Sequence, residues 1–420
     1  MKLHFLRFPL HNYFLLFLLL EGSIFASEEQ RLSGKRLLIL YSCPTVQKGG
    51  SVTPGGSSEY KLNLFNYLLS ARIDVQLFVV DFKGLQESLK RQGLPFIGMT
   101  TSSVKKRNEE IQKQLGFVCR CQKIDLIHCN SPFELIIVKK VAKALGIKVV
   151  VTLHGDNLHK SNCLKGIDGV IGVSSGITTL LEQSNRALDF QIKKIAWIPP
   201  FFNETKFLSF SPQYTKQAFF KEHFGIEITS DPIVCSIANF YQTHKNHAVL
   251  IKAIKNLKDV AGKNVQVMLA GDGKRLSDIR ALGQKLGLER QIHFLGHIDC
   301  VSELLYHSDI NVLTSDMEAF GIALLEGAVM KKPLIGTRGT GMENIITHEA
   351  TGLLFRKNDE RDLAVQLKRL LNNPAYGTQL ASNAHAFVLA NYGMEATLGK
   401  IINFYADVLS NSEESSVGNE

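Results

Sequence analysis

Short apolar runs alternate with amphipathic stretches along most of this chain. In the first half the runs are rich in Val, Ile and Leu, and they cover residues 36–41, 74–80, 125–129, 148–153 and 169–173. Continuous runs of this kind are typical of parallel strands that are buried on both faces. Helical patterns lie between them, for example over 58–70 and 132–145, and Gly146 is a typical stop signal for the second of these helices.

The second half repeats the alternation, with apolar runs at 233–238, 265–270, 292–295, 310–314, 333–336 and 352–355. Between the halves, Trp197-Ile198-Pro199-Pro200 cannot lie inside a helix, because proline lacks an amide hydrogen and restricts the residue before it. The pattern predicts an α/β protein with two doubly wound domains, 35–200 and 201–390. A ligand is expected at the carboxyl ends of the strands, in a cleft between the domains.

The two ends of the chain differ from the rest. Lys2 and Arg7 precede an apolar run at 13–20, so residues 1–27 suit a secretory leader cut after Ala26, a short interfacial anchor, or an over-extended start of translation. We expect residues 391–410 to form a helix that packs back on the first domain. The polar, acidic residues 411–420 are expected to be disordered.

Composition narrows the class of protein. A length of 420 residues suits about two or three domains, and 45% hydrophobic with 21% charged residues exclude a mostly disordered or collagen-like chain. No apolar run reaches ~18 residues, which excludes a polytopic membrane protein. The formal charge of +9 fits an anionic partner, whether phosphates, acidic lipid or nucleic acid.

The seven cysteines do not suggest a disulfide framework, because a chain of this length can build its own core. Cys119-x-Cys121 lacks a second pair, and His154, His159 and Cys163 match no common zinc spacing. We therefore expect reduced thiols and no metal site.

The segment from 308 to 326 carries the strongest chemical signal. A buried strand ends near Ser315, a turn carries Glu318, and Gly321 allows the backbone to approach a ligand closely. A helix then begins near Ile322, and the amides at its start favour an anion. Glu326 lies about one turn into that helix, so both glutamates can face the predicted cleft.

This segment resembles the E-x7-E signature of the retaining glycosyltransferases of family four, also called group 1, which have the GT-B fold of two Rossmann-like domains that face a central cleft. The run Lys332–Thr337, then Gly341 and Gly352-Leu353-Leu354, continues the family pattern. Ser236–Asn239 followed by Lys245-Asn246-His247 is similar to the family's phosphate-binding segment. The chain departs from the family at Asn239, where an Arg is usual.

Further motifs extend the resemblance from residue 36 to about 405. Gly271-Asp272-Gly273 and Phe294-Leu295-Gly296 are similar to turns of the second domain, and Gly55-Gly56 followed by Ser57 and Ser58 resembles the glycine loop that opens a helix of the first domain, with either serine as its cap. Thr152-Leu153-His154-Gly155 matches the segment whose histidine lies beside the transferred sugar in the family.

The resemblance implies that the enzyme moves a hexose-type sugar, with retention, from a nucleotide diphosphate sugar to a lipid-linked, polysaccharide or other glycan acceptor such as lipopolysaccharide. It implies catalytic roles for His154, Lys245 and Glu318. The implied donor-binding residues are Gly56, Asn239, Lys245, Gly273, Gly321, Ile322 and Glu326. No Asp-x-Asp occurs, which suits a metal-independent reaction with no cofactor besides the donor.

Each signal also has an ordinary structural explanation. His154 can be a core histidine, Lys245 can be solvated, and His244 and His247 are more typical of a surface than of a metal site. Gly271-x-Gly273 is not a dinucleotide fingerprint, because Leu276 occupies the position of the third glycine. The competing functions are a sugar-nucleotide epimerase or phosphorylase of the same fold, and a degenerate nucleotide-sugar-binding protein without turnover. Nucleic-acid binding is disfavoured, because the sequence contains no recognisable motif for nucleic-acid recognition.

The resemblance also bears on location. Nucleotide sugars are made in the cytoplasm of most cells, so it favours a cytoplasmic protein that is peripheral at the membrane over one exported through the leader. Six basic residues of the first domain suit an anionic membrane surface, although solvated helix faces explain them equally well: Arg36, Lys105, Lys106, Arg107, Lys139 and Lys140.

Overall fold

The computed structural model describes residues 30–42, 56–81, 89–90, 93–100, 107–155, 162–200, 202–262 and 264–410. The chain divides into two compact units. The first unit consists of Met1–Phe201 together with Met394–Glu420, and the second is the continuous stretch Phe202–Gly393. The predicted leader 1–27, the tail 411–420 and the glycine loop before residue 56 lie outside the described residues.

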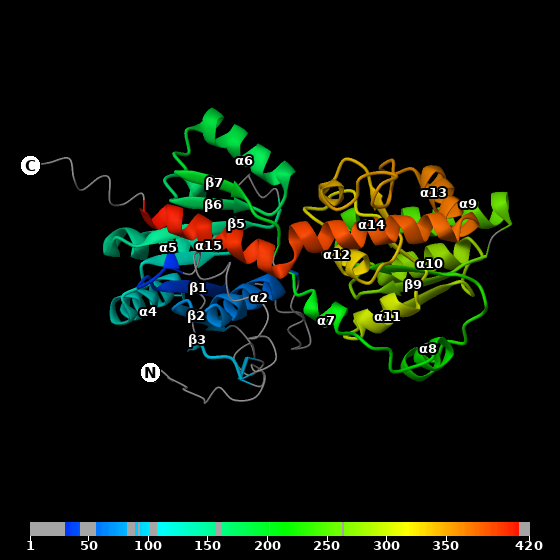
Figure 1. The fold of residues 1–420 in the computed structure, drawn as a ribbon, viewed down its shortest axis with the longest axis horizontal. Helices are drawn as coiled ribbons and strands as arrows, with labels where there is room; N and C mark the ends of the chain where they lie inside the picture. Colours follow the sequence, from blue (N-terminus) through cyan, green and yellow to red (C-terminus); the bar gives the residue numbers. More distant parts are fainter. Residues whose placement is uncertain are drawn as a thin grey trace, which may run out of the picture. The chain divides into compact units, whose positions relative to one another are not determined.

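The first unit contains a seven-stranded parallel sheet in the order β3-β2-β1-β4-β5-β6-β7 (Figure 1). Its strands are β1 (Leu37–Ser42), β2 (Val75–Asp81), β3 (Ile97–Thr100), β4 (Leu126–Cys129), β5 (Lys148–Leu153), β6 (Gly169–Gly172) and β7 (Lys194–Trp197). Its helices are α2 (Gly56–Ser70), α4 (Arg107–Gln122), α5 (Pro132–Leu145), α6 (Ser175–Leu188) and α15 (Met394–Ser410).

The second unit contains a six-stranded parallel sheet in the order β10-β9-β8-β11-β12-β13. Its strands are β8 (Ile233–Ile237), β9 (Gln266–Ala270), β10 (Ile292–Gly296), β11 (Ile310–Leu313), β12 (Leu334–Thr337) and β13 (Leu353–Phe355). Its α-helices are α7 (Thr205–Leu208), α8 (Lys216–Phe224), α9 (His247–Ala261), α10 (Leu276–Lys285), α11 (Val301–His307), α12 (Ile322–Val329), α13 (Glu360–Asn372) and α14 (Pro374–Tyr392). Two short 3₁₀ turns, η2 (Thr243–Lys245) and η3 (Gly341–Asn344), complete it.

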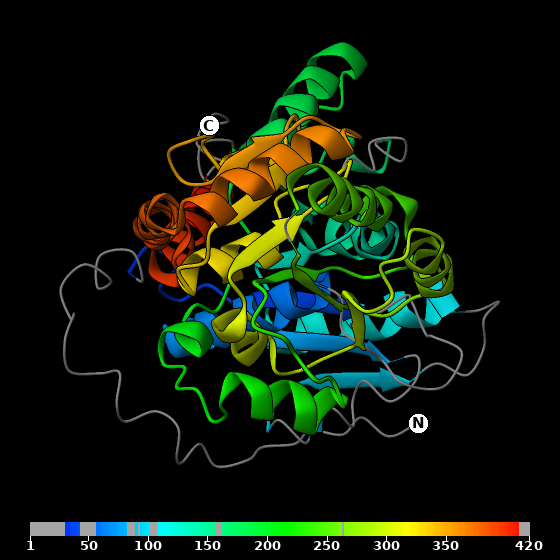
Figure 2. The ribbon, with the colours of Figure 1, turned by 90° about the vertical axis from the view of Figure 1, so that its right-hand side faces the viewer.

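Successive strand residues of the second unit face two separate cores. Ile233 and Cys235 pack with α11, α12 and α14, whereas Val234 packs with α9, α10 and α13. Helices therefore cover both faces of the sheet, as Figure 2 shows. Both sheets contain the 3-2-1-4-5-6 order of a doubly wound Rossmann-like fold. The predicted fold class of two such domains is confirmed.

Every apolar run that was predicted to be a strand forms one, whereas β3 and β7 were not predicted. Both are four-residue strands at the two edges of the first sheet. An edge strand has a neighbour on one side only, and β7 is at most partly buried. Such strands do not need the continuous apolar run that identifies a central parallel strand.

The chain returns to the first unit after the second is complete. Helix α14 packs on α12, and α15 packs on α2 and β5. Ile401, Ile402 and Tyr405 of α15 share a core cluster with Leu64 and Phe65 of α2. The predicted helix over 391–410 therefore begins at Met394, because residues up to Tyr392 continue α14.

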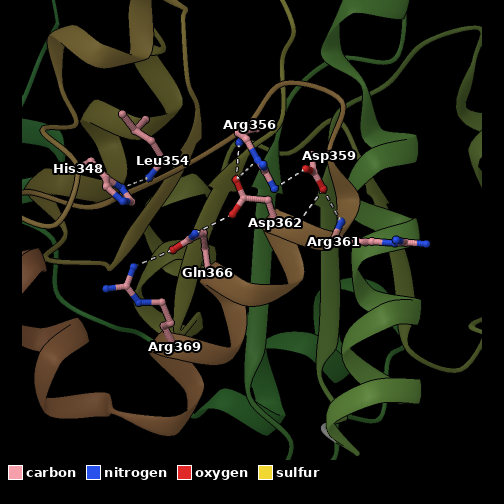
Figure 3. Close-up of polar contacts among 8 residues, drawn as sticks. All are labelled: His348, Leu354, Arg356, Asp359, Arg361, Asp362, Gln366 and Arg369. Atoms are coloured by element: carbon pink, nitrogen blue, oxygen red, sulfur yellow. Dashed lines mark hydrogen bonds and ion pairs between the residues drawn. The ribbon is translucent and has the colours of Figure 1, made fainter.

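Charged side chains fix the start of α13 in the second unit (Figure 3). Asp359 caps the helix by accepting hydrogen bonds from the amides of Arg361 and Asp362, at 3.1 and 2.9 Å. Arg356 pairs with Asp359 at 2.9 Å and with Asp362 at 3.3 Å. Burial acts to raise the pKa of Asp362, but bonds from the Arg356 amide, Gln366 and the Arg356 guanidinium outweigh it and lower that pKa.

Within the described part of the chain, no helix combines the length and apolar character that a bilayer crossing requires. The six described cysteines are free thiols, of which Cys119, Cys129 and Cys235 are buried.

Candidate active site

The carboxyl ends of β8 and β11 meet where the strand order of the second unit reverses. These strands are paired neighbours, and a reversal of this kind leaves a crevice outside the strand ends where ligands of open α/β sheets bind. The loop after β8 contains Asn239 and Lys245, and the loop after β11 contains Glu318 and Gly321. The topology thus places four of the predicted site residues at one edge of one sheet.

Backbone and side-chain hydrogen bonds join the two loops. The amide of Asp316 donates to the carbonyl of His244 at 2.7 Å, and the hydroxyl of Thr314 donates to the carbonyl of Lys245 at 3.1 Å. The amide group of Asn246 donates to both carboxylate oxygens of Asp316 at 3.0 Å. Since Asn246 also begins the turn into α9, these bonds fix the segment on both sides of Lys245.

Lys245 and Glu318 form an ion pair across the joined loops. The ammonium nitrogen lies 2.7 Å from a carboxylate oxygen, and each side chain is 16% exposed. A charge-assisted hydrogen bond of this length in a largely buried place is stronger than a surface ion pair. The structure therefore brings two of the three predicted catalytic residues into direct contact, and it excludes the explanation of Lys245 as a merely solvated lysine.

Gly341 supports the turn that carries Glu318. Its amide donates to the carbonyl of Glu318 at 2.8 Å. A Cβ at this position would lie 1.9 Å from the carbonyl oxygen of Ala319, so only glycine fits without a shift of backbone. The sequence pattern singled out Gly341, and the geometry supplies its physical reason.

Helix α12 begins directly after this turn. Gly321 precedes it with φ of 100°, in the left-handed region that glycine adopts without strain, and Ile322 is the first helical residue. The amides of Leu324 and Leu325 donate to the carbonyl of Gly321, at 2.8 and 3.3 Å. The amides of Ile322 and Ala323, which precede them, are the ones that an anion at this helix start can meet. Glu326 lies on the same helix and is partly buried.

The glycine turn after β9 packs against the loop after β8. A Cβ on Gly271 would lie 2.1 Å from the carbonyl oxygen of Ala238, and one on Gly273 would lie 2.4 Å from the carbonyl carbon of Phe240. Both glycines are therefore required for close approach of one protein segment to another. Asn239, between these contacts, is exposed, and its side-chain oxygen accepts from the amide of Tyr241 at 3.3 Å.

His247 is buried, which corrects the expectation of a surface histidine. Its ring stacks on Phe240 with centroids 3.9 Å apart, and the residue is 4% exposed. Burial lowers the pKa of His247 to about 4; the Ala238 carbonyl opposes this change, while the charges of Lys245 and Arg275 add to it. His247 therefore supports the Lys245 loop as a neutral, packed ring.

His154 follows β5 in the first unit. Its Nε2 atom is buried and has no hydrogen-bond partner among the described residues, and the ring of Tyr60 contacts the imidazole with centroids 4.7 Å apart. Burial, with the nearby charge of Lys61, lowers the pKa of His154 to about 3. The imidazole is neutral near pH 7, so it can donate and accept hydrogen bonds but does not act as a cation.

Asn130 is a candidate that the sequence reasoning missed. It follows β4, next to β5, and both polar atoms of its buried amide lack a partner among the described residues. Its backbone amide donates to Glu134 at 2.6 Å, and Glu134 pairs with Lys61 at 3.0 Å in a buried ion pair. The sequence did contain a signal for Asn130, because this polar residue directly follows a buried apolar run, as His154 does.

Gly56 is the first residue of α2, which therefore starts two residues before the predicted helix. Ser57 and Ser58 lie in the first turn and do not precede it. Among the described residues, no group of three or more His, Cys, Asp or Glu side chains is placed to hold a metal ion.

Comparisons with known proteins agree with this geometry. Residues 218–387 match the family described as glycosyl transferases group 1, and residues 54–205 match glycosyltransferase family 4. The chain is 26% identical over 317 residues to N-acetyl-alpha-D-glucosaminyl L-malate synthase of Bacillus anthracis, an alignment that covers 73% of this chain and 81% of the relative.

Solved structures show the same fold. The chain is similar to a glycosyltransferase from Rickettsia africae ESF-5, with a TM-score of 0.74 and 20% identity over 90% of this chain and 100% of that one. It is also similar to HepE of Anabaena in complex with UDP and glucose, with a TM-score of 0.73 and 18% identity over 89% of this chain and 99% of that one. With two adjoining family matches and this fold, the chain belongs to the group 1 glycosyltransferases of the GT-B type.

Proposed function

We propose that this chain is a retaining hexosyltransferase. It moves a hexose-type sugar from a nucleoside diphosphate sugar to a lipid-linked, polysaccharide or other glycan acceptor, without a metal ion. The observation that carries the proposal is the Lys245–Glu318 contact at the strand-order reversal of the second unit, directly before the start of α12.

The chemistry of this place suits a diphosphate leaving group. In the proposed step the bond between the anomeric carbon and the diphosphate oxygen breaks, and the acceptor oxygen bonds to the same face of the sugar. The acceptor proton passes to the leaving phosphate oxygen. Because the diphosphate gains negative charge, the Lys245 ammonium and the amides at the start of α12 stabilise it.

The remaining site residues receive roles from the family resemblance. Glu326 would bind the ribose hydroxyls, and Glu318 would bind hydroxyls of the transferred sugar. His154 would hold a sugar hydroxyl. Its lowered pKa supports this role, because a neutral imidazole does not repel the positive charge that develops on the sugar.

A thermal-shift screen tests the proposal. The donors are UDP-glucose, UDP-N-acetylglucosamine, GDP-mannose and ADP-glucose, each compared with its free nucleoside diphosphate. A donor at about 100 times its Kd should stabilise the protein by roughly 2.7 kcal/mol. Release of the nucleoside diphosphate from the binding donor then shows turnover, and a panel without any shift would contradict the proposal.

Asn239 motivates one other function, a nucleotide-sugar-binding protein without turnover. The residue is exposed and brings no charge to the edge where Lys245 lies. Calorimetric binding of a donor without any release of nucleoside diphosphate, with glycan acceptors added, would favour this alternative.

We also propose that the acceptor is presented at a membrane surface. Two of the basic residues that suggested this have structural tasks instead: Arg36 pairs with Asp74 at 3.0 Å, and Lys139 donates to the carbonyls of Cys163 and Lys165. Lys140 is exposed. Sedimentation with vesicles containing phosphatidylglycerol, against vesicles of phosphatidylcholine alone, tests the proposal, and equal binding to both would contradict it.

A further inference from the structure

Two neighbouring strands of the first unit carry polar side chains inside an apolar core. His128 of β4 is 1% exposed and Thr152 of β5 is fully buried. The Nε2 atom of His128 lies 2.8 Å from the Thr152 hydroxyl oxygen. Polar groups at this depth cost free energy unless they are hydrogen-bonded, so their presence between two central strands calls for a physical reason.

Tyrosine hydroxyls extend this pair at both ends. The Nδ1 atom of His128 is hydrogen-bonded to the hydroxyl of Tyr405, which comes from α15. The hydroxyl oxygen of Thr152 lies 3.3 Å from that of Tyr60, which comes from α2. Burial raises the pKa of both tyrosines, so both hydroxyls keep their protons. A continuous chain of hydrogen bonds therefore joins α15 to α2 through β4 and β5.

The imidazole in this chain is neutral. Burial, followed by the nearby His154 and Lys61, lowers the pKa of His128 to about 3. A neutral imidazole donates from one ring nitrogen and accepts at the other. The bonds to Tyr405 and Thr152 therefore run in opposite directions and fix the orientation of the ring.

His154 lies next to Tyr60, the last member of this hydrogen-bond chain. His154 is the first residue after β5 and lies two positions after Thr152. The ring of Tyr60, whose hydroxyl meets Thr152, packs against the imidazole of His154 with an interplanar angle of 78°. The position of the Tyr60 ring thus depends on Thr152 at one end and limits the position of His154 at the other.

We propose that Tyr405 is a positioning residue for His154, acting through His128, Thr152 and Tyr60. The inference rests on the proposed role of His154 at the transferred sugar. A misplacement of about 1 Å at a reacting group can cost about 10²-fold in rate. Loss of one hydrogen bond at the far end of the chain should cost less, so Tyr405→Phe should lower kcat by roughly three- to tenfold with little change in donor KM.

A double-mutant cycle tests this coupling. The rate of nucleoside diphosphate release is measured for the full-length protein, for Tyr405→Phe, for His154→Ala and for the double variant, each at saturating donor. If Tyr405 acts through His154, Tyr405→Phe has no further effect once His154 is replaced. Effects that multiply would overturn the proposal. Thr152→Val, which removes the central hydroxyl, repeats the cycle should Tyr405→Phe fail to fold.

Tyr392→Phe is the matched control. Tyr392 is also buried, its hydroxyl donates to the carbonyl of Asn344 at 2.5 Å, and it belongs to the second unit. Tyr392→Phe removes a tyrosine hydroxyl, as Tyr405→Phe does, but this hydroxyl is not part of the hydrogen-bond chain that leads towards His154. The effect of Tyr392→Phe on kcat should therefore multiply with that of His154→Ala.

A second readout does not require turnover. In protein labelled with ¹⁵N-histidine, Tyr405→Phe should shift the ring signals of both His128 and His154, whereas Tyr392→Phe should shift neither. Unmoved His154 signals in Tyr405→Phe would overturn the positioning role. Unchanged turnover in His154→Ala would instead contradict the proposed function of His154, and the ring signals would still decide whether the two residues are coupled.

Discussion

The ammonium nitrogen of Lys245 lies 2.7 Å from a carboxylate oxygen of Glu318, although 73 positions of the chain separate the two residues. An ammonium has three N–H donors, so one bond to Glu318 leaves two that can meet phosphate oxygens. A side chain that is already ordered loses less entropy when it binds a ligand. In the proposed reaction, Glu318 would thus hold Lys245 ready for the diphosphate at the edge of the second sheet.

Replacing Lys245 by Ala should lower turnover by about 10²-fold or more, because the developing charge on the diphosphate loses a preorganised donor. The measurement is kcat at saturating donor. Lys255→Ala is the matched control, since Lys255 lies on α9 of the same unit and pairs with Asp259 at 2.9 Å in a more exposed place. It should leave kcat unchanged, and an unchanged kcat in Lys245→Ala would rule out the proposed role.

Gly341→Ala should destabilise the protein by about 1–3 kcal/mol, because the added Cβ forces the backbone of the Glu318 turn to move. Donor binding should weaken in parallel, since the same turn precedes α12. Urea unfolding and donor titration measure the two effects. Gly176→Ala in α6, where nothing lies within 4 Å of an added Cβ, is the control. Equal stability of the two variants would contradict the close packing under Glu318.

The free energy of unfolding should fall as the pH falls below about 6.5, the ordinary pKa of histidine. His247 has a pKa of about 4 in the folded protein, so between these values the unfolded chain binds a proton that the folded protein does not. Between these pH values, His247 alone lowers the free energy of unfolding by up to about 1.4 kcal/mol for each unit by which the pH falls. His247→Phe should therefore make the decline shallower.

Urea unfolding at a series of pH values between 7 and about 4 measures this slope. His297→Phe, at a histidine whose side chain is 55% exposed, is the matched control for the loss of an imidazole. A slope in His247→Phe that matches the unsubstituted protein would show that His247 is protonated in the folded state.

Gly169→Ala should loosen α15 from the first unit. An added Cβ would lie 2.9 Å from the ring of Phe404 and 3.0 Å from Val408, both of which are buried residues of α15. We expect a loss of about 1–3 kcal/mol in the free energy of unfolding. Gly116→Ala, in the middle of α4, meets only ordinary contacts and should stabilise the protein by up to about 1 kcal/mol. A stabilising Gly169→Ala would show that α15 is free to adjust.

Much of this fold could be predicted from the sequence, because the central strands of a parallel sheet are continuously apolar. The run at 148–153, for example, forms β5 with those bounds. Strands β3 and β7, at the two edges of the first sheet, were not predicted; β7 is at most partly buried and so does not need a strongly apolar run. The start of α15 at Met394 also depends on tertiary packing, because the helical pattern continues through α14 with only Gly393 between the two helices.

Residues of the candidate site could be predicted from the sequence, but the contacts between them could not. The sequence places Lys245 and Glu318 at strand ends, but their ion pair depends on the pairing of β8 with β11. The burial of His247 likewise depends on the ring of Phe240, seven positions earlier. Asn130 follows a buried apolar run as His154 does, but only the structure shows that both polar atoms of its amide are buried without a described partner.

The return of α15 makes the first unit discontinuous, and this bears on the order of folding during synthesis. Residues 202–393 form a continuous stretch that can fold as soon as it has left the ribosome. The first unit, although it is translated earlier, cannot bury Leu64 and Phe65 against Tyr405 until the chain has been made beyond position 405. The part of the protein that is encoded first is therefore completed last, and a chain stopped just after Gly393 would expose the apolar surface that this helix covers.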